Sequence, residues 1–461
     1  MISFTRLKKD VEKIKDYPVL SKSHFCDLTI GVRYLWRDAF KVDYAIYNDT
    51  LIMKETCRDY SNAFYFPIGK DVFSALSEIE NYCVVSHTPL IFCCLTEEQL
   101  LFLKDRYSFS EHYFLRDWSD YIYPKEQFIT YSGNKLAGQR NHVNKFKKSY
   151  PEYSFKVMTK DDIPGVISFY TSLGGDYKHA VWSEKEERAK LKDYIKNALT
   201  LGQVGGVLKV KDEIVGFSIG EICGDTLYCH VEKANPTFSG VYPTIASEFV
   251  KAFGADVLYC NREEDCGDFG LRTSKLQYHP SVIANKYILK VYTLFNKIDK
   301  DLCIATERLT ITPIKKKDAD TYYVLYLDDE LNKYWGYDYR EDLSGTPDKN
   351  YFFEFQKRLK KNREEFSFAV RLSGKMIGEL VLYNFDHLGG AEMGFRFFTE
   401  YQNQGYAFES ATALKDYVFN VLGAKSLRSR CFKKNSSSCK LIEKLGFKLK
   451  KETETHYFFE I

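Results

Sequence analysis

The sequence has 461 residues, of which 44% are hydrophobic and 28% charged, and its formal net charge is +3. This length predicts about two to four domains, and the composition is typical of globular proteins. The nearly balanced charge argues against a sequence-independent nucleic-acid binder, and no apolar stretch is long enough to cross a bilayer. We expect a cytoplasmic protein without membrane insertion.

The first 150 residues contain two segments with a clear pattern. Residues 1–17 are rich in charge and predict a helix, and "DYAIYNDTLIMKE" (43–55) predicts a strand-turn-strand hairpin. The twelve cysteines form no C-x-x-C pair, and Cys93-Cys94 lies in an apolar run. We therefore expect buried free thiols, with neither a disulfide framework nor a metal site.

A basic stretch follows at 133–151, "GNKLAGQRNHVNKFKKSYP", and a stretch dense in charge and glycine lies at 261–280. The first predicts a helix whose basic side chains face an anion, and a solvated basic helix is the alternative. Together the two stretches and their surroundings suggest a cleft, to whose residues we assign no roles. Its candidate residues are Arg140, Asn141, His142, Glu232, Gly240, Asn261, Arg262, Glu263 and Lys275.

An internal repeat organises the rest of the chain. Residues 154–170 and 309–325 each predict a strand, a polar turn and a helix, and residues 206–222 and 368–384 each predict a hairpin. The pairs Gly254-Ala255 and Lys275-Leu276 recur, in the same order, as Gly423-Ala424 and Lys444-Leu445. We infer two copies of one α/β unit at 151–297 and 303–461, joined by a polar linker, and a divergent third copy at 1–150.

The second copy contains a candidate phosphate loop. "AEMGFRFF" (391–398) alternates as a half-buried strand, with Met393, Phe395 and Phe397 on one face. It leads into "QNQGYA" (402–407), after which apolar residues recur at helical spacing. A glycine loop at a helix N-terminus can bind a pyrophosphate through backbone N–H groups. A plain strand-to-helix turn is the alternative.

Three segments carry a family resemblance: "TERLTITPIKKKDA" (306–319), the strand and loop just described, and "NSSSCKLIEKLGF" (435–447). Together they resemble the GNAT acyltransferase superfamily, closest to its Rim-type N-acetyltransferases. The resemblance implies acetyl-CoA as acyl donor, no metal, and a small amine or a peptide N-terminus as acceptor. Gln402 stands where Arg is commoner in the family.

The resemblance also assigns residues to the cofactor. Backbone amides from Gln404 to Ala407 hold the pyrophosphate, and the strand at Phe397 and Phe398 pairs with the pantetheine arm. Asn435 and Ser438 lie near the thioester, although Asn435 with Gly446 also reads as a helix N-cap and C-cap pair. The implied cofactor-binding residues are Phe397, Phe398, Gln402, Gln404, Gly405, Tyr406, Ala407, Asn435 and Ser438.

Transfer by direct attack needs an amine without its proton and a thiolate that regains one. Glu392 lies on the strand where the family often has a carboxylate, and we expect it to act as general base; an exposed structural glutamate is the alternative. "THYFFE" at the C-terminus offers His456 and Tyr457 as acids, and a packed aromatic is the alternative for Tyr457.

The N-terminal part resembles a different group. Its two charged stretches, with "HVEKANPTFSGVYPTI" (230–245), are similar to an uncharacterised bacterial family related to the C-terminal domain of phosphatidylglycerol lysyltransferases. That domain has two GNAT-like halves, which suits residues 1–297, and its relatives take aminoacyl-tRNA as donor. The loop at Gly240 keeps only the glycine of the phosphate-loop pattern, so we expect CoA at Gly405 rather than there.

We therefore expect an α+β protein with two or three GNAT-like modules in tandem, each a mixed, mostly antiparallel sheet flanked by helices. The domains are 1–150, 151–297 and 303–461. The expected function is N-acetylation in the last module. The alternatives are aminoacyl transfer from tRNA by the N-terminal pair, or a non-catalytic protein that binds CoA or another small molecule. The oligomeric state stays open.

Overall fold

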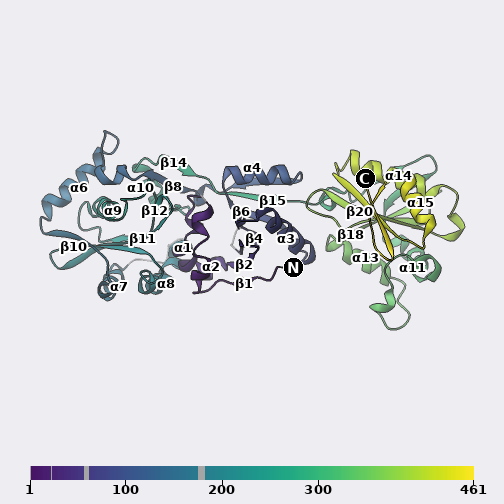
Figure 1. Cartoon of the computed structure of the whole chain (residues 1–461), viewed down its shortest axis with the longest axis horizontal. Coiled ribbons are helices and arrows are strands. Elements are labelled where there is room, and N and C mark those ends of the chain that lie inside the picture. Colours follow the sequence, from purple (N-terminus) through teal and green to yellow (C-terminus); the bar gives the residue numbers. More distant parts are fainter. Residues whose placement is uncertain (1, 22, 57–61, 175–181) are drawn as a thin grey trace. The chain divides into compact units, whose positions relative to one another are not determined.

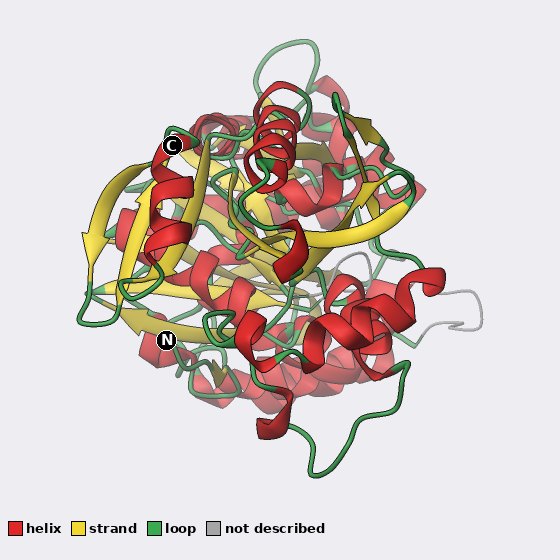
Figure 2. Ribbon diagram, turned by 90° about the vertical axis from the view of Figure 1, so that its right-hand side faces the viewer, coloured by secondary structure: helices red, strands yellow, loops and turns green. Residues whose placement is uncertain are grey.

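The structure, a computed structural model, describes residues 2–21, 23–56, 62–174 and 182–461. The chain divides into two compact units. The first comprises residues 1–82, 91–102 and 112–290, and the second 83–90, 103–111 and 291–461. Figure 1 shows the elements along the chain, and Figure 2 separates helices from strands by colour. Among the described residues, no helix is long and apolar enough to cross a membrane.

The first sheet has the order β1-β2-β3-β4-β6-β15-β7, and β5 pairs with β3. Its strands are β1 (Thr5–Arg6), β2 (Asp43–Tyr47), β3 (Thr50–Glu55), β4 (Ala63–Phe64), β5 (Ile68–Gly69), β6 (Leu90–Leu95), β7 (Ser110–Phe114) and β15 (Tyr287–Val291). The helices in this part of the chain are α1 (Ile30–Leu35), α2 (Arg37–Phe40), α3 (Val72–Val85) and α4 (Glu97–Arg106). The predicted hairpin at 43–55 is confirmed as β2 and β3.

The helix predicted at 1–17 is wrong. The structure has a two-residue strand and then only a short 3-10 turn at Val11–Ile14. Leu7, Val11 and Ile14 are buried in the core. Packing of these apolar side chains decides the conformation of the segment, which overrides the weak helix propensity of a short charged stretch.

The second sheet has the order β14-β8-β13-β12-β11-β10-β9. Its strands are β8 (Asp120–Pro124), β9 (Tyr153–Val157), β10 (Val204–Val210), β11 (Glu213–Cys223), β12 (Thr226–Ala234), β13 (Tyr259–Asn261) and β14 (Val282–Ala284). The helices are α5 (Glu126–Thr130), α6 (Ala137–Ser149), α7 (Ile163–Ser172), α8 (Trp182–Asn197), α9 (Val241–Phe253) and α10 (Phe269–Gln277). The chain passes twice between the two sheets of this unit. β8 follows β7 of the first sheet but belongs to the second, and β15 follows β14 of the second sheet but belongs to the first.

The third sheet has the order β16-β17-β18-β19-β20-β21-β23-β22. Its strands are β16 (Ile304–Ala305), β17 (Leu309–Pro313), β18 (Glu365–Leu372), β19 (Lys375–Tyr383), β20 (Gly390–Phe397), β21 (Ser426–Phe432), β22 (Lys448–Glu452) and β23 (His456–Glu460). The helices are α11 (Ala319–Leu327), α12 (Asp329–Asn332), α13 (Tyr351–Lys361), α14 (Tyr406–Asn420) and α15 (Ser436–Lys444).

Helices cover both faces of the third sheet, as the second unit in Figure 1 shows. One face packs its core against α14, through Ala411, Leu414 and Val418. The other face packs against α11 and α13, with Tyr322 and Phe352 fully buried. The fold is thus α+β with three mixed, mostly antiparallel sheets, as the sequence predicts.

The described cysteines form no disulfide, and six of them are buried. The expectation that the thiols are buried therefore holds for only part of the described cysteines. Cys303 is exposed because it lies in the connection that leads to β16, and four others are half-buried. Cys57 lies outside the described residues.

Candidate active site

The loop before α14 is the predicted phosphate loop. Gly405 is its N-cap residue and has a φ of 85°, in the left-handed region that glycine adopts readily. No side chain caps the helix, so the N–H groups of its first turn face outward for an anion. Among the described residues, a Cβ at Gly405 would meet only Arg308 Nη2, at 3.2 Å. The loop therefore offers backbone donors, the positive end of a helix dipole and a close approach to the backbone.

The two glutamine side chains of the loop bond to the nearby main chain. Gln402 Nε2 donates to Phe397 O at 2.9 Å, and Gln404 Nε2 donates to Glu400 O at 2.6 Å. Both side chains thus hold the loop in shape.

Arg308 supplies a positive charge beside this loop. Its Nη1 donates to Gln404 O at 3.1 Å, its Nε donates to Glu409 at 2.7 Å, and its guanidinium lies over the Tyr406 ring at 4.6 Å. Arg308 thus holds the loop through the Gln404 carbonyl, while its charge is paired with Glu409. Arg308 belongs to the segment at 306–319, but the sequence does not predict its contact with the loop, because 96 positions separate it from Gln404.

Next to the loop, β20 and β21 separate. They pair in parallel only from Gly390 to Glu392, whereas the other edge of β21 stays paired with β23 from Arg428 to Phe432. Ser429 Oγ donates to Met393 O at 2.9 Å, so Met393 directs its backbone groups toward the gap. Because alternate residues of a strand point the same way, Phe395 directs its N–H and C=O into this gap too.

The predicted pantetheine contacts lie one step further along the strand. Phe397 O accepts the Gln402 bond, and Phe398 N–H donates to Ile377 O at 3.2 Å. These two backbone groups are already used, so the open stretch of the strand is centred on Phe395. Sequence spacing could not locate it, because the point of separation depends on how β21 pairs with β23.

Glu392 lies at the point where the strands separate and is 8% exposed. Tyr383 Oη donates to its Oε1 at 2.6 Å, and Asn384 Nδ2 donates to its Oε2 at 2.9 Å. Arg430 Nε lies 3.2 Å from Oε1. Burial and the adjacent carboxylate raise the pKa of Tyr383, which keeps its hydroxyl protonated and donating to Glu392.

The structure does not bring Glu392 and Tyr457 together. Register places Tyr457 opposite Cys431, on the face that packs against α14 and α15. Glu392 pairs with Arg428, on the opposite face. His456 lies on the Glu392 face, 4.0 Å from the Phe432 ring centroid. Tyr457 packs beside Phe459 on β23, an inner strand between β21 and β22, as the alternative of a packed aromatic expects.

Asn435 caps α15, because its side chain accepts from Ser438 N–H at 3.2 Å. Gly446, with a φ of 95°, follows the helix end. The predicted pair of caps is therefore confirmed.

Aromatic residues cover the Glu392 face of β20. Gly394, the next residue on this face, has Trp335 above it, and a Cβ there would meet Trp335 at 3.7 Å. The Tyr334 and Phe432 ring centroids are 5.6 Å apart. Arg396 stacks on the Trp335 ring at 4.2 Å and pairs with buried Glu379 at 2.7 Å. This pair fixes Trp335 over the strand, so the segment after α12 forms an aromatic wall beside the gap.

The corresponding loop of the first unit has the same backbone conformation at its glycine, but α6 fills the space beside it. Gly240 precedes α9 with a φ of 87°. A Cβ there would collide with the His142 carbonyl of α6. Val241 N–H donates to Phe238 O at 3.0 Å, and Pro243 has no N–H group. The basic helix α6 therefore fills the space that is open at Gly405.

The other residues of the predicted N-terminal cleft are internally bonded. Arg262 Nη2 donates to Glu232 at 2.6 Å, and Lys275 Nζ donates to the Glu263 carbonyl at 3.2 Å. Arg140 Nη1 donates to the Gly133 carbonyl at 3.1 Å. Asn141, like His142, is on α6. A small cavity adjoins the Glu232–Arg262 pair and is otherwise lined by apolar residues and Cys229 and Cys260.

Sequence reasoning missed a buried charged cluster in this unit. Lys286 pairs with Asp27, with Asp120 at 2.8 Å and with Glu264 at 3.5 Å. Asn261 Nδ2 donates to Asp120 at 2.9 Å. Burial raises the pKa of Glu264 to about 8, against the opposing charge of Lys286. Charged residues are rarely buried, so composition offers no signal for such a cluster.

Two known families match the chain. Residues 19–290 match the family described as phosphatidylglycerol lysyltransferase, C-terminal, and residues 308–448 match the GNAT acetyltransferase domain. The first match spans more than half of the chain. The crystal structure of a conserved protein of unknown function from Bacteroides thetaiotaomicron is 28% identical, with a TM-score of 0.59 over 63% of this chain and all of that one.

Two curated relatives match parts of the chain. An uncharacterized protein of Mycoplasmoides gallisepticum is 25% identical over 38% of this chain, and the chain spans 56% of that relative. The uncharacterized N-acetyltransferase YnaD of Bacillus subtilis is 29% identical over 32% of this chain and 82% of that protein.

Proposed function

We propose that this chain, which belongs to the phosphatidylglycerol lysyltransferase C-terminal family over residues 19–290 and carries a GNAT domain over 308–448, transfers an acetyl group from acetyl-CoA to an amine in its second unit. The observation that carries the proposal is the geometry at Gly405. Outward N–H groups, an uncapped helix start and the Arg308 cation lie at one end of an open strand edge.

The proposed donor fits these groups. The first-turn amides of α14 and Arg308 bind the pyrophosphate. The backbone of Phe395 pairs with the amide groups of pantetheine, which directs the thioester toward Gly394. The thioester supplies an activated acyl carbon, and a backbone N–H of β20 polarises its carbonyl.

The acceptor amine enters along the aromatic wall of Tyr334 and Trp335. Glu392 accepts the proton of the amine, directly or through one water, and Tyr383 holds the carboxylate in place. The amine nitrogen then forms a bond to the acyl carbon, the carbon–sulfur bond breaks, and the departing thiolate takes the second proton that the nitrogen loses as it becomes an amide.

Calorimetry and turnover test this proposal on the full chain. We expect one acetyl-CoA site per chain, and release of the CoA thiol only when an amine from a panel of polyamines and peptide N-termini is present. Absence of binding would refute the proposal. Binding without amine-dependent thiol release would favour the non-catalytic alternative.

The family match and the closed Gly240 loop favour a second candidate for the first unit. Because α6 covers Gly240, this loop has no space for CoA. The family that matches the first unit is named after phosphatidylglycerol lysyltransferase. The candidate is aminoacyl transfer from tRNA. Salt-sensitive binding of charged tRNA by the full chain would support it, and absence of binding at low salt would exclude it.

A further inference from the structure

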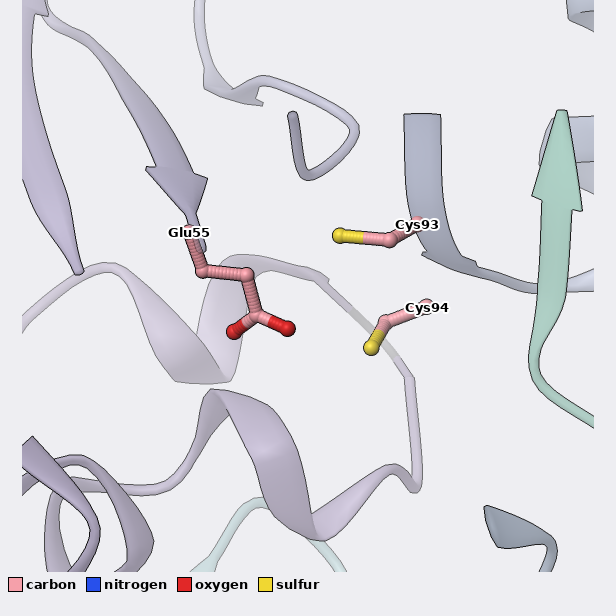
Figure 3. Close-up of side chains that lie close together, drawn as sticks. All are labelled: Glu55, Cys93 and Cys94. Atoms are coloured by element: carbon pink, nitrogen blue, oxygen red, sulfur yellow. The ribbon is translucent and has the colours of Figure 1, made fainter. Parts of the chain in front are cut away.

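Three donor side chains converge in the first unit, next to the buried cluster that contains Lys286 and Asp27. Glu55 is at the end of β3, and Cys93 and Cys94 are near the end of β6. Their exposed fractions are 2%, 0% and 9%. One carboxylate oxygen and the two sulfur atoms all lie within 4.8 Å of one another. Figure 3 shows both sulfur atoms on the side of β6 that faces Glu55.

The backbone at Cys94 makes this convergence possible. Successive residues of a regular strand point to opposite faces, so two adjacent cysteines would not share a side. Cys94 has a φ of 50°, in the left-handed region, which breaks the alternation. This conformation costs a residue with a side chain about 1–2 kcal/mol.

Two buried groups hold the carboxylate of Glu55. Arg33 Nη1 donates to its Oε2 at 3.2 Å, and Tyr65 Oη donates to the same oxygen. Arg33 is completely buried, and its Nη2 also donates to Tyr65 at 2.8 Å. Carboxylates that bind metals are commonly oriented by such outer hydrogen bonds.

We propose that Glu55, Cys93 and Cys94 bind a thiophilic divalent cation, with Zn²⁺ as the best match. Thiolate sulfur and carboxylate oxygen are zinc ligands, whereas Ca²⁺ and Mg²⁺ select oxygen alone. Each thiol releases its proton on coordination. The charges of the cation, two thiolates, the Glu55 carboxylate and the Arg33 guanidinium then cancel, and Asp27, 3.9 Å from Arg33, is itself paired with Lys286. Because of this balance, the buried Arg33 guanidinium beside the site does not prevent a metal cation from binding.

The donor set needs only a small contraction. With Zn–S bonds of about 2.3 Å and Zn–O bonds of about 2.1 Å, tetrahedral donors lie roughly 3.5 Å apart. Side-chain rotations of the cysteines and the glutamate supply this change. Three protein ligands leave a fourth position for water. The sequence analysis expects no metal site. It could not predict this one, because residues 55 and 93–94 do not have the spacing of a known metal motif.

Metal titration of the full chain tests the proposal. After treatment with a chelator and a reductant, Zn²⁺ is added in competition with a chromophoric chelator, and Co²⁺ is added in parallel for its thiolate charge-transfer absorption. We expect one equivalent of either ion per chain. We expect Cys93→Ser and Glu55→Gln to weaken binding at least about tenfold, and Cys260→Ser, a buried cysteine elsewhere in the unit, to leave it unchanged.

Cys94→Gly is the control that separates a loss of metal ligands from a loss of binding caused by unfolding. Glycine accepts the positive φ, so this variant removes the thiol while it relieves the strain. Its melting temperature should stay close to that of the wild type, because the relieved strain offsets the loss of the buried thiol, and its metal binding should weaken at least about tenfold, as in Cys93→Ser. Binding of less than about a tenth of an equivalent, or equal binding by all variants, would overturn the proposal. So would a freshly purified chain that is lighter by two hydrogens and has lost both thiols, which would indicate a vicinal disulfide instead.

Discussion

The two glycine loops of the chain should respond in opposite ways to the same substitution. Gly405→Asp places a carboxylate at the proposed pyrophosphate site and beside Arg308, which it can capture. A pair of like charges about 4 Å apart costs about 1 kcal/mol in water and about 4 kcal/mol near a protein surface. We therefore expect CoA binding to weaken by at least about tenfold, the equivalent of 1.4 kcal/mol. The melting temperature should fall less than in Gly240→Asp, because the positive φ disfavours aspartate at both glycines but the new Cβ at Gly405 meets only the flexible Arg308 side chain.

Gly240→Asp should instead destabilise the first unit and leave CoA binding intact. Its Cβ would collide with the His142 carbonyl of α6, and overpacking of this kind costs about 1–3 kcal/mol. For a unit of this size that corresponds to a melting transition roughly 2–12 °C lower. Calorimetric titration with CoA and differential scanning calorimetry of both variants measure the two effects. Equal loss of CoA affinity in both variants, or unchanged affinity in Gly405→Asp, would refute the reasoning.

Three further predictions concern single side chains. Arg308→Ala should weaken CoA binding roughly two- to fivefold and reduce its salt dependence, as expected for a half-exposed charge, whereas Arg340→Ala, an exposed arginine of the same unit, should not. Glu392→Gln should lower the acetyl-transfer rate about 100-fold in a thiol-release assay at unchanged CoA affinity; an unchanged rate would remove Glu392 as the base. Burial opposes the charge on His230, but Glu221 and Glu263 outweigh it and raise its pKa to about 9. Because the folded pKa lies above the ordinary value of 6.5, the stabilisation of about 3 kcal/mol is complete below pH 6.5 and is lost as the pH rises through 9. Calorimetry of the first unit at pH 6.5 and 9.5 should show this loss in the wild type and much less in His230→Gln.

Local features of the fold could be predicted from the sequence because neighbouring residues determine them. The hairpins, the helix start after Gly405 and the Asn435 cap follow from turn residues, alternation and capping chemistry. The segment at Val11 shows the limit, since its buried side chains, not its propensity, set its conformation.

The unpredicted parts of the candidate site all depend on long-range packing. No periodicity relates Arg308 to Gln404, or Glu392 to Arg430. The same holds for α6, which covers Gly240 from almost a hundred positions earlier in the chain. A sequence pattern identifies the glycine, but only the tertiary structure shows what lies against it.

The strand exchange within the first unit constrains how this chain folds during synthesis. β15 lies between β6 and β7 in the first sheet, yet 172 residues separate the end of β7 from its start. At about 5–20 residues per second, the ribosome needs roughly 10–30 s to deliver that strand. Until then the facing edges of β6 and β7 lack their partner, and such edges invite pairing with other chains. During synthesis the strand that carries Cys93 and Cys94 therefore waits longest for its partner in the first sheet.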